Sequence, residues 1–353
     1  MRTVKIGMIG AGAIAPTHCQ GIQLHPAAEL VAIADASKER AGALSHEFRV
    51  DRVYADPAEL LRNPDIEAVS IALPNYLHAS TAIAALQAGK HVLLEKPFAM
   101  SVAEAIEVVA AAKKSGKIFT VGMNQRFTRE AQTVRELKDR GELGEIYHAK
   151  AYWLRRAGAP KFGTWFLHKK RSGGGVLLDI GVHMLDLALS LMGNFAVETV
   201  SGFSYLKFGN RGLGEGGWGK SDAEEHLFDV DDFSGGLIRL AGGATLQLDV
   251  SWIRHQADAD RHNVELFGTE GGAAVYPPRL FKFLPAGAGY QTIEPKAGSL
   301  KYKHCNRHHN WIDAILGEAP LEATLEQALT VQRVIDALYE SAASGREVMF
   351  PKK

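Results

Sequence analysis

The sequence predicts an α/β domain with a doubly wound, mostly parallel sheet, followed by an α+β domain with a large, mostly antiparallel open sheet. Three observations predict this fold. Over residues 1–122, short apolar runs alternate with helical patterns, as in βαβ units. A glycine-rich turn follows the first apolar run. Beyond residue 122, the runs alternate like half-buried strands, and turn glycines separate them. The chain therefore divides into residues 1–122 and residues 123–353.

The first domain is predicted to contain buried parallel strands, because its apolar runs are nearly continuous, as in a sheet covered on both faces. The strands are expected at Val4–Ile9, Leu30–Ala34, Ala68–Leu73, His91–Leu94 and Ile118–Val121. Helical spacing predicts helices at Ala13–Leu24, Ser37–Glu47 and His78–Gln87. A capping box of Ser101 and Glu104 opens a further helix, which Gly116 ends.

The second domain is predicted to be a mostly antiparallel sheet with a few helices. Strands are expected at Ile146–Trp153, Val197–Tyr205, Phe228–Leu240, Thr245–Trp252, His262–Phe267 and Ala273–Tyr276. Helices are expected at Glu130–Arg140, after the Gly173-Gly174-Gly175 run, and at Thr324–Ser344. The glycine-rich segment Gly209–Gly219 is expected to be a surface loop.

Composition narrows the classes of function and location. Lysine plus arginine equals aspartate plus glutamate, at 40 each, so no charge excess favours nucleic acid or an anionic membrane as partner. Cys19 and Cys305 match no metal or redox spacing and are expected to be free thiols. The apolar stretch Val176–Met192 contains three ionisable residues, which argues against a membrane span. We therefore expect a cytoplasmic protein, with Ile6–Ala15 as mature structure rather than a signal peptide.

The turn after the first strand has the pattern G-x-G-x-x-A. Gly10 permits a tight turn, Gly12 lets the backbone approach a pyrophosphate, and the small Ala15 lets the helix pack on the strand. The helix N-terminus offers free N–H groups and a partial positive charge to phosphates. Gly10, Gly12, Ala13, Ile14 and Ala15 are therefore expected to bind a dinucleotide in a Rossmann domain.

Asp35 ends the second predicted strand, 23 residues after Gly12. In this fold an acidic residue about 20 residues past the turn binds the ribose hydroxyls. A carboxylate there repels the extra phosphate of NADP, so NAD is the expected cofactor and NADP is less favoured. Ser37 and Lys38 follow closely and make that preference less strict. The alternative role for Asp35 is the N-cap of the next helix.

The segment Glu95-Lys96-Pro97 follows the fourth predicted strand. Because the carboxyl ends of parallel strands face the ligand crevice, Lys96 is placed where chemistry can occur. The alternative is a solvated surface lysine, which is the usual state of this residue type.

At this point the chain resembles the glucose–fructose oxidoreductase, inositol dehydrogenase and rhizopine catabolism (Gfo/Idh/MocA) family of sugar and cyclitol dehydrogenases. Four segments carry the resemblance, in the family's order and spacing. They are the Gly10–Ala15 turn, Pro74-Asn75-Tyr76-Leu77-His78, Glu95-Lys96-Pro97, and the run from Gly173 to Asp186 that begins Gly-Gly-Gly-Val-Leu-Leu-Asp.

The resemblance implies residue roles. Lys96 resembles the family's lysine near the nicotinamide and the reacting hydroxyl, and Asp179 and His183 resemble the aspartate and histidine of its catalytic triad. On the cofactor side the implied residues are Pro74, Asn75, His78, Glu95, Lys96 and Asn124. The implied substrate-binding residues are Lys96, Arg126, Asp179 and His183, and residue type adds Arg155 and Trp165 as further candidates.

The residue types suit oxidation of a secondary alcohol. Asp179 and His183 are four residues apart on a predicted helix, hence on one face. A histidine that titrates near neutrality suits the acceptor of the hydroxyl proton, and a lysine cation stabilises the developing alkoxide. Asp179, His183 and Asp186 also offer metal-binding atoms, but hydride transfer beside a lysine needs no metal, so none is expected. For Asp186 we favour pairing with a neighbouring basic group.

Other assignments stay open at this level. Arg155 and Trp165 suit sugar binding through hydrogen bonds and stacking, while ordinary packing is equally compatible. His308 and His309 suit either a substrate pocket or the surface.

The expected function is transfer of a hydride between a sugar or cyclitol and NAD. One alternative keeps NAD tightly bound, for sugar–sugar oxidoreduction or oxidative glycoside cleavage; another is a non-catalytic NAD-binding regulator. The half-apolar strand Thr245–Trp252 and the family resemblance lead us to expect a homodimer or homotetramer.

Overall fold

The computed structural model describes residues 2–219, 221, 227–295, 304 and 306–351, and it divides into two compact units. The first unit comprises Met1–Met123 together with Asn306–Gln332, and the second comprises Asn124–Cys305 with Arg333–Lys353. The predicted division at residue 122 did not anticipate that a segment near the C-terminus belongs to the first unit.

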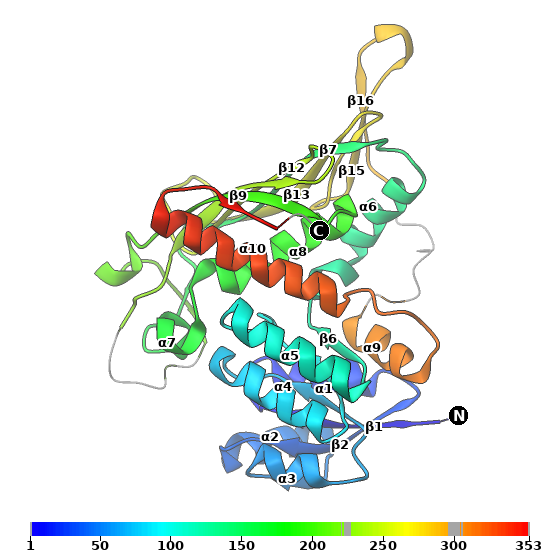
Figure 1. Cartoon of the computed structure of the whole chain (residues 1–353), viewed down its shortest axis with the longest axis vertical. Coiled ribbons are helices and arrows are strands. Elements are labelled where there is room, and N and C mark those ends of the chain that lie inside the picture. The colour runs from blue at the N-terminus through cyan, green and yellow to red at the C-terminus, as the bar shows by residue number, and fades with distance from the viewer. Residues whose placement is uncertain (1, 220, 222–226, 296–303, 305, 352–353) are drawn as a thin grey trace. The chain divides into compact units, whose positions relative to one another are not determined.

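The first unit contains a six-stranded parallel sheet of order β3-β2-β1-β4-β5-β6. Figure 1 labels β1, β2 and β6 of this sheet. Its strands are β1 (Val4–Ile9), β2 (Ala28–Ala34), β3 (Arg52–Tyr54), β4 (Ala68–Ile71), β5 (His91–Leu94) and β6 (Phe119–Val121). Its helices are α1 (Ala15–Gln23), α2 (Lys38–Phe48), α3 (Pro57–Arg62), η1 (Asn75–Leu77), α4 (His78–Gln87), α5 (Val102–Ser115) and α9 (Arg307–Leu316). This order confirms the predicted doubly wound sheet, because the chain reverses direction across the sheet between β1 and β4.

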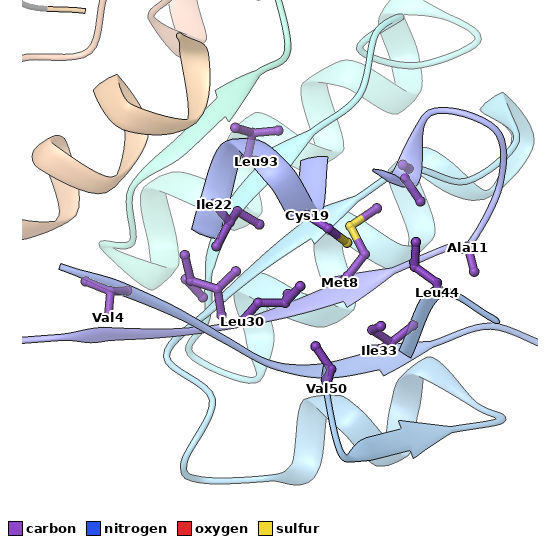
Figure 2. Packing of buried hydrophobic residues seen from close by; sticks show 14 of the residues in the cluster. Val4, Met8, Ala11, Cys19, Ile22, Leu30, Ile33, Leu44, Val50 and Leu93 are labelled. Atoms are coloured by element: carbon purple, nitrogen blue, oxygen red, sulfur yellow. The ribbon is translucent and has the colours of Figure 1, made fainter. Parts of the chain in front are cut away.

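Side-chain alternation along β1 explains why helices cover both faces of this sheet. Val4, Ile6 and Met8 are fully buried and join a core cluster with residues of α1, α2 and α9 (Figure 2). Gly7 points the other way, where a Cβ atom would meet the side chain of Leu60 in α3. A strand buried on both faces needs apolar or very small residues, and β1 provides them at every position except the exposed Lys5.

The second unit contains a nine-stranded sheet of order β16-β15-β14-β13-β7-β12-β11-β9-β17. Its strands are β7 (Ile146–Arg155), β9 (Val197–Tyr205), β11 (Phe233–Leu240), β12 (Thr245–Ser251), β13 (Asp260–Gly268), β14 (Gly272–Ala274), β15 (Arg279–Phe283), β16 (Tyr290–Ile293) and β17 (Val348–Met349). All neighbouring pairs are antiparallel except β7 and β12. The predicted large, mostly antiparallel open sheet is confirmed.

Several helices and short elements accompany this sheet. They are η2 (Asn124–Phe127), α6 (Arg129–Asp139), η3 (Trp165–Leu167), α7 (Lys169–Ser172), η4 (Leu177–Gly181), α8 (Val182–Met192), η5 (Gly209–Arg211), η6 (Pro285–Gly287) and the long helix α10 (Leu325–Ser344), whose first eight residues belong to the first unit. A small parallel pair joins β8 (Ala159–Pro160) to β10 (Glu215–Trp218). Part of the segment expected to be a loop, Gly209–Gly219, is therefore strand and short helix.

The strand β12 shows how one face of the sheet is covered. Leu246, Leu248 and Val250 are fully buried and lie toward η4 and α8, whereas Gln247 is exposed on the opposite face. The apolar side of this strand is thus covered within the unit itself. The half-apolar strand therefore gives no reason to expect an oligomer, contrary to the argument from the sequence.

One helical stretch, Lys169–Met192, is long and apolar enough to cross a membrane by length and composition alone. In the protein, 83% of its most apolar window is buried. A core helix of a folded domain has the same properties, and ionisable residues inside the stretch make hydrogen bonds within the unit. We therefore interpret it as the central helix of the second unit.

Cys19 gives a test of the packing around α1. Its side chain is fully buried, and burial raises the pKa of its thiol to about 12. Because the thiolate is the reactive form, native protein at pH 8 should show almost no alkylation of Cys19 by iodoacetamide. The measurement is peptide mass spectrometry, with protein in urea as the positive control. Equal labelling of native and unfolded protein would contradict this packing. Cys305 lies outside the described residues.

Candidate active site

The glycine turn lies where the sheet changes direction. Gly10 follows β1, has a φ of +98°, and approaches the carbonyl of Ala72, which follows β4, so closely that a Cβ atom would collide with it. A positive φ and this contact together require glycine. The ends of the two central strands are thereby brought together at the point where doubly wound sheets bind their ligands.

The next residues of the turn form an open cradle. Gly12, Ala13 and Ile14 are exposed, and a Cβ atom built on Gly12 would have no atom within 4 Å. Ile14 is the N-cap of α1 and offers no side-chain acceptor to the first N–H groups of the helix, while Ala15 is fully buried against the sheet. An anionic group next to Gly12 would reach the free backbone N–H groups and the positive end of the α1 helix dipole without steric hindrance. The turn therefore fits the pyrophosphate of NAD.

Asp35 is tied to this turn. Its carboxylate accepts hydrogen bonds from the backbone N–H of Ala11 at 2.7 Å, from that of Ser37 at 2.7 Å, and from the guanidinium of Arg40 at 3.1 Å. Ser37, not Asp35, is the N-cap of α2, because its hydroxyl accepts from the N–H of Arg40. The alternative N-cap role of Asp35 is thus wrong, and the predicted ribose contact stays a prediction.

The buried ring of His78 fixes the segment from Pro74 to His78 through contacts with two backbone carbonyl groups. Both ring nitrogens of His78 lie 2.8 Å from carbonyl oxygens, Nδ1 from that of Pro97 and Nε2 from that of Leu73. Burial lowers the pKa of His78, although two carbonyl acceptors favour the protonated ring. His78 therefore joins the loop after β4 to the segment that contains Lys96. Asn75 is buried and Pro74 is half-buried, and their cofactor contacts stay predictions.

Glu95 and Lys96 follow β5 directly. Lys96 is half-buried, whereas the carboxylate of Glu95 is buried and contacts His18 at 2.8 Å and Arg307. Burial would raise the pKa of Glu95, but the Arg307 guanidinium and the His18 ring hold it well below the usual range. Sequence reasoning missed His18 and Arg307. His18 lies on the buried side of α1 with Ala15, Cys19 and Ile22, and this periodicity was the available signal.

In the second unit, the glycine run before Asp179 is fixed by Asp231. The carboxylate of Asp231 accepts from the N–H groups of Gly175 at 2.6 Å and Leu177 at 3.1 Å, and from the hydroxyls of Ser234 and Tyr339. A Cβ atom on Gly175 would collide with the carbonyl of Asp231. The glycine is therefore required by close backbone contact, and Asp231 fixes where the following helix begins.

Asp179 lies in η4, which is a turn of π-helix, and His183 lies in the first turn of α8. Single π turns in α-helices are frequent at functional sites. The indole Nε1 of the fully buried Trp252 donates a hydrogen bond to Oδ2 of Asp179 at 3.0 Å. Asp179 and His183 are each about nine-tenths buried. The regular helix predicted for this pair is interrupted, and Trp252 was not predicted to take part.

Asp186 forms a buried ion pair with Arg126. Nε and Nη2 of Arg126 donate to the two carboxylate oxygens of Asp186 at 2.7 and 2.6 Å, and the guanidinium lies over the ring of Phe195. The favoured interpretation of Asp186 as the partner of a basic group is confirmed. Among the described residues, no three histidine, cysteine, aspartate or glutamate side chains gather as a metal site.

Four further residues were candidates for binding cofactor or substrate: Asn124, Arg155, Trp165 and His308. Asn124 is exposed at the start of η2. Arg155 in β7 pairs with Asp260 at 3.2 Å and stacks on Trp153, and Trp165 in η3 stacks on Phe166 with ring centroids 3.9 Å apart. These contacts account for their packing, and their substrate contacts stay predictions. His308, by contrast, is buried in the first unit, where its ring lies edge-on to that of His18.

Most of the chain matches known protein families and individual relatives. A family model for an oxidoreductase family with an NAD-binding Rossmann fold matches residues 4–123, and one for a GFO/IDH/MocA C-terminal domain matches residues 131–274. D-glucoside 3-dehydrogenase of Escherichia coli K12 is 32% identical over 98% of this chain and 97% of its own. Levoglucosan dehydrogenase of Pseudarthrobacter phenanthrenivorans is 29% identical over 77% and 73%.

The solved structures agree with the fold described above. A levoglucosan dehydrogenase, in complex with NADH and levoglucosan, superposes with a TM-score of 0.86 at 24% identity, over 99% of this chain and all of that one. The two-unit architecture is thus shared over the full length. The first unit is an NAD-binding Rossmann domain.

Replacing Asp35 by alanine should weaken NAD binding about 10- to 100-fold. The change removes a charged acceptor, worth about 1.5–3 kcal/mol per hydrogen bond, and releases the N–H of Ala11 within the phosphate turn. Isothermal titration with NAD measures the effect. Asp51→Ala, an exposed aspartate in the same unit, is the control. Equal affinities of the two variants would show that Asp35 does not serve the cofactor.

Replacing Arg126 by methionine should lower the free energy of unfolding by about 3–5 kcal/mol, because it leaves the buried charge of Asp186 uncompensated. Urea unfolding measures this loss. The double variant Arg126→Met, Asp186→Leu should recover most of it. A single variant as stable as the parent would contradict the buried ion pair.

Proposed function

The chain belongs to the GFO/IDH/MocA family of oxidoreductases, and on this basis we propose that it oxidises a secondary alcohol of a sugar, cyclitol or sugar derivative with NAD. The observation that carries the proposal is the match to D-glucoside 3-dehydrogenase over 98% of this chain. A D-glucoside oxidised at C3 is therefore the first substrate to test. The levoglucosan dehydrogenase relative supports a pyranose-derived substrate.

The residues of the Gly10–Ala15 turn would hold NAD, which when bound would supply the acceptor for the hydride of the carbon that bears the hydroxyl. His183 removes the hydroxyl proton, and Lys96 stabilises the negative charge that develops on that oxygen. Asp179 positions the substrate or orients these groups, and Trp252 fixes the carboxylate through its 3.0 Å hydrogen bond. The alcohol becomes a ketone: its proton passes to His183, and its hydride passes to NAD.

We also propose a cytoplasmic homodimer or homotetramer. The buried free thiol of Cys19 is compatible with a reducing compartment. On β15 and the edge strand β16, Phe283 is 90% and Tyr290 67% exposed, and aromatic residues are enriched in protein interfaces. Light scattering tests the assembly, and a monomeric mass would contradict it.

A substrate screen tests the reaction. Purified protein is mixed with NAD or NADP and a panel of methyl glucosides, free sugars and inositols, and NADH formation is followed by absorbance. We expect turnover with at least one glucoside and with NAD in preference to NADP. Substrate consumption without free NADH would instead identify the tightly bound NAD alternative. The absence of turnover over the whole panel, with tight NAD binding, would favour a regulator.

Alanine at Lys96 or His183 should reduce kcat by about 10²–10⁴-fold, which is the usual contribution of a positioned acid–base or electrostatic group. Steady-state kinetics with the substrate from the screen provide the measurement. Lys114→Ala and His46→Ala change exposed residues of the same types and should leave kcat unaltered. A parental kcat in either active-site variant would remove that residue from the mechanism.

A further inference from the structure

A buried polar cluster in the first unit surrounds the residue that precedes Lys96. Glu95 is 6% exposed, and one carboxylate oxygen, Oε1, contacts Nε2 of His18 at 2.8 Å and the guanidinium of Arg307. The other oxygen, Oε2, accepts the backbone N–H of Lys96 at 3.0 Å. The Glu95 carboxylate therefore fixes the orientation of the peptide group between Glu95 and Lys96.

The partners of Glu95 come from separate elements. His18 lies in α1, and its Nδ1 is 2.7 Å from the hydroxyl of Ser70 in β4. Arg307 begins α9 and also donates to the carbonyl of Gly122, which follows β6, at 2.6 Å. Nε2 of His18 lies 2.8 Å from Oε1 of Glu95 and 3.0 Å from Nη2 of Arg307, so the ring donates to Glu95 when its proton is on Nε2 and accepts from Arg307 when its proton is on Nδ1. The cluster thus joins α1, β4, α9 and the ends of β5 and β6.

Close packing leaves this cluster little freedom. A Cβ atom on Gly122 would lie 2.7 Å from Nη1 of Arg307, and one on Gly21 would collide with the ring of His308. The ring of His308 in turn lies edge-on to His18, with centroids 4.8 Å apart. Glycine at position 21 lets α9 approach α1, and glycine at position 122 leaves room for the Arg307 guanidinium beside Glu95.

The charges in the cluster balance. Burial and the nearby Arg307 lower the pKa of His18, so its ring is neutral, while Arg307 keeps Glu95 ionised. One anion and one cation therefore compensate each other inside the unit. Removal of either would leave a buried charge, which is strongly unfavourable.

We infer that Glu95, His18 and Arg307 are positioning residues for Lys96, and that the segment Asn306–Gln332 supports the active-site lysine through Arg307. This inference rests on the proposed role of Lys96. It assigns Glu95 an action through the backbone of Lys96 in place of the contact with NAD expected from the resemblance. A displacement of about 1 Å at a reacting group costs on the order of 10²-fold in rate, so the support has a measurable effect.

The same part of the fold provides a matched control. His25, just after α1, pairs with Asp313 in α9 at 2.9 Å, and both side chains are buried. This pair also joins a histidine to an acid between the α1 region and α9, whereas Glu95 is the acid that accepts the backbone N–H of Lys96. Asp313→Asn and Glu95→Gln are the same chemical change at two comparable sites, and only one of them adjoins the lysine.

The kinetic experiment compares Glu95→Gln, Arg307→Lys and Asp313→Asn with the parent, using the substrate from the screen. We expect Glu95→Gln and Arg307→Lys to lower kcat about 10- to 100-fold while the Kd for NAD changes less than about threefold. Asp313→Asn should lose a similar amount of thermal stability and keep its kcat. If Glu95→Gln does not fold, Arg307→Lys, which retains the cation, carries the test.

A second readout needs no substrate. Hydrogen exchange, followed by mass spectrometry of the peptide containing Lys96, should be faster in Glu95→Gln than in the parent or in Asp313→Asn. Equal exchange and equal kcat in Glu95→Gln and Asp313→Asn would overturn the inference, as would a raised Kd for NAD with parental kcat. If Lys96→Ala retains full activity, the proposed function of Lys96 fails instead, whereas the exchange result still tests the support of its backbone.

Discussion

An ionised carboxylate can be buried only with partners that compensate its charge, and Glu95 is such a carboxylate. Satisfying it requires a histidine from the helix after the phosphate turn and an arginine from a helix near the C-terminus. The glycines at positions 21 and 122 leave room for these partners, and the segment Asn306–Gln332, which contains the arginine, belongs to the first unit.

In the second unit a buried carboxylate also fixes the backbone, but its hydrogen-bond donors are uncharged groups. Asp231 accepts hydrogen bonds from two backbone N–H groups and two hydroxyls, and so fixes the start of the segment that contains Asp179. Trp252 then holds the Asp179 carboxylate directly. In both units, a carboxylate outside the predicted catalytic set determines the backbone geometry beside a predicted catalytic residue. Substitutions of Glu95 or Asp231 should lower kcat although neither side chain is expected to touch the reacting atoms.

The fold was predictable from the sequence because its signals are local. Alternating apolar runs, the turn at Gly10 and the acidic residue at Asp35 each depend on neighbours within one βαβ unit. The pairing of Asp186 with a basic residue was also foreseen. The return of α9 to the first sheet was not, because Arg307 meets Glu95 across more than two hundred residues and no periodicity marks such a contact. The π turn at Asp179 had no sequence signal either.

In the proposed function, a hydride passes from a sugar carbon to NAD. The most direct test uses methyl β-D-glucoside that carries deuterium at C3, incubated with the enzyme and NAD, followed by NMR of the recovered cofactor. We expect deuterium at C4 of the nicotinamide ring, together with the 3-keto glucoside. Recovery of NADH without deuterium, or of unchanged glucoside and NAD, would contradict it.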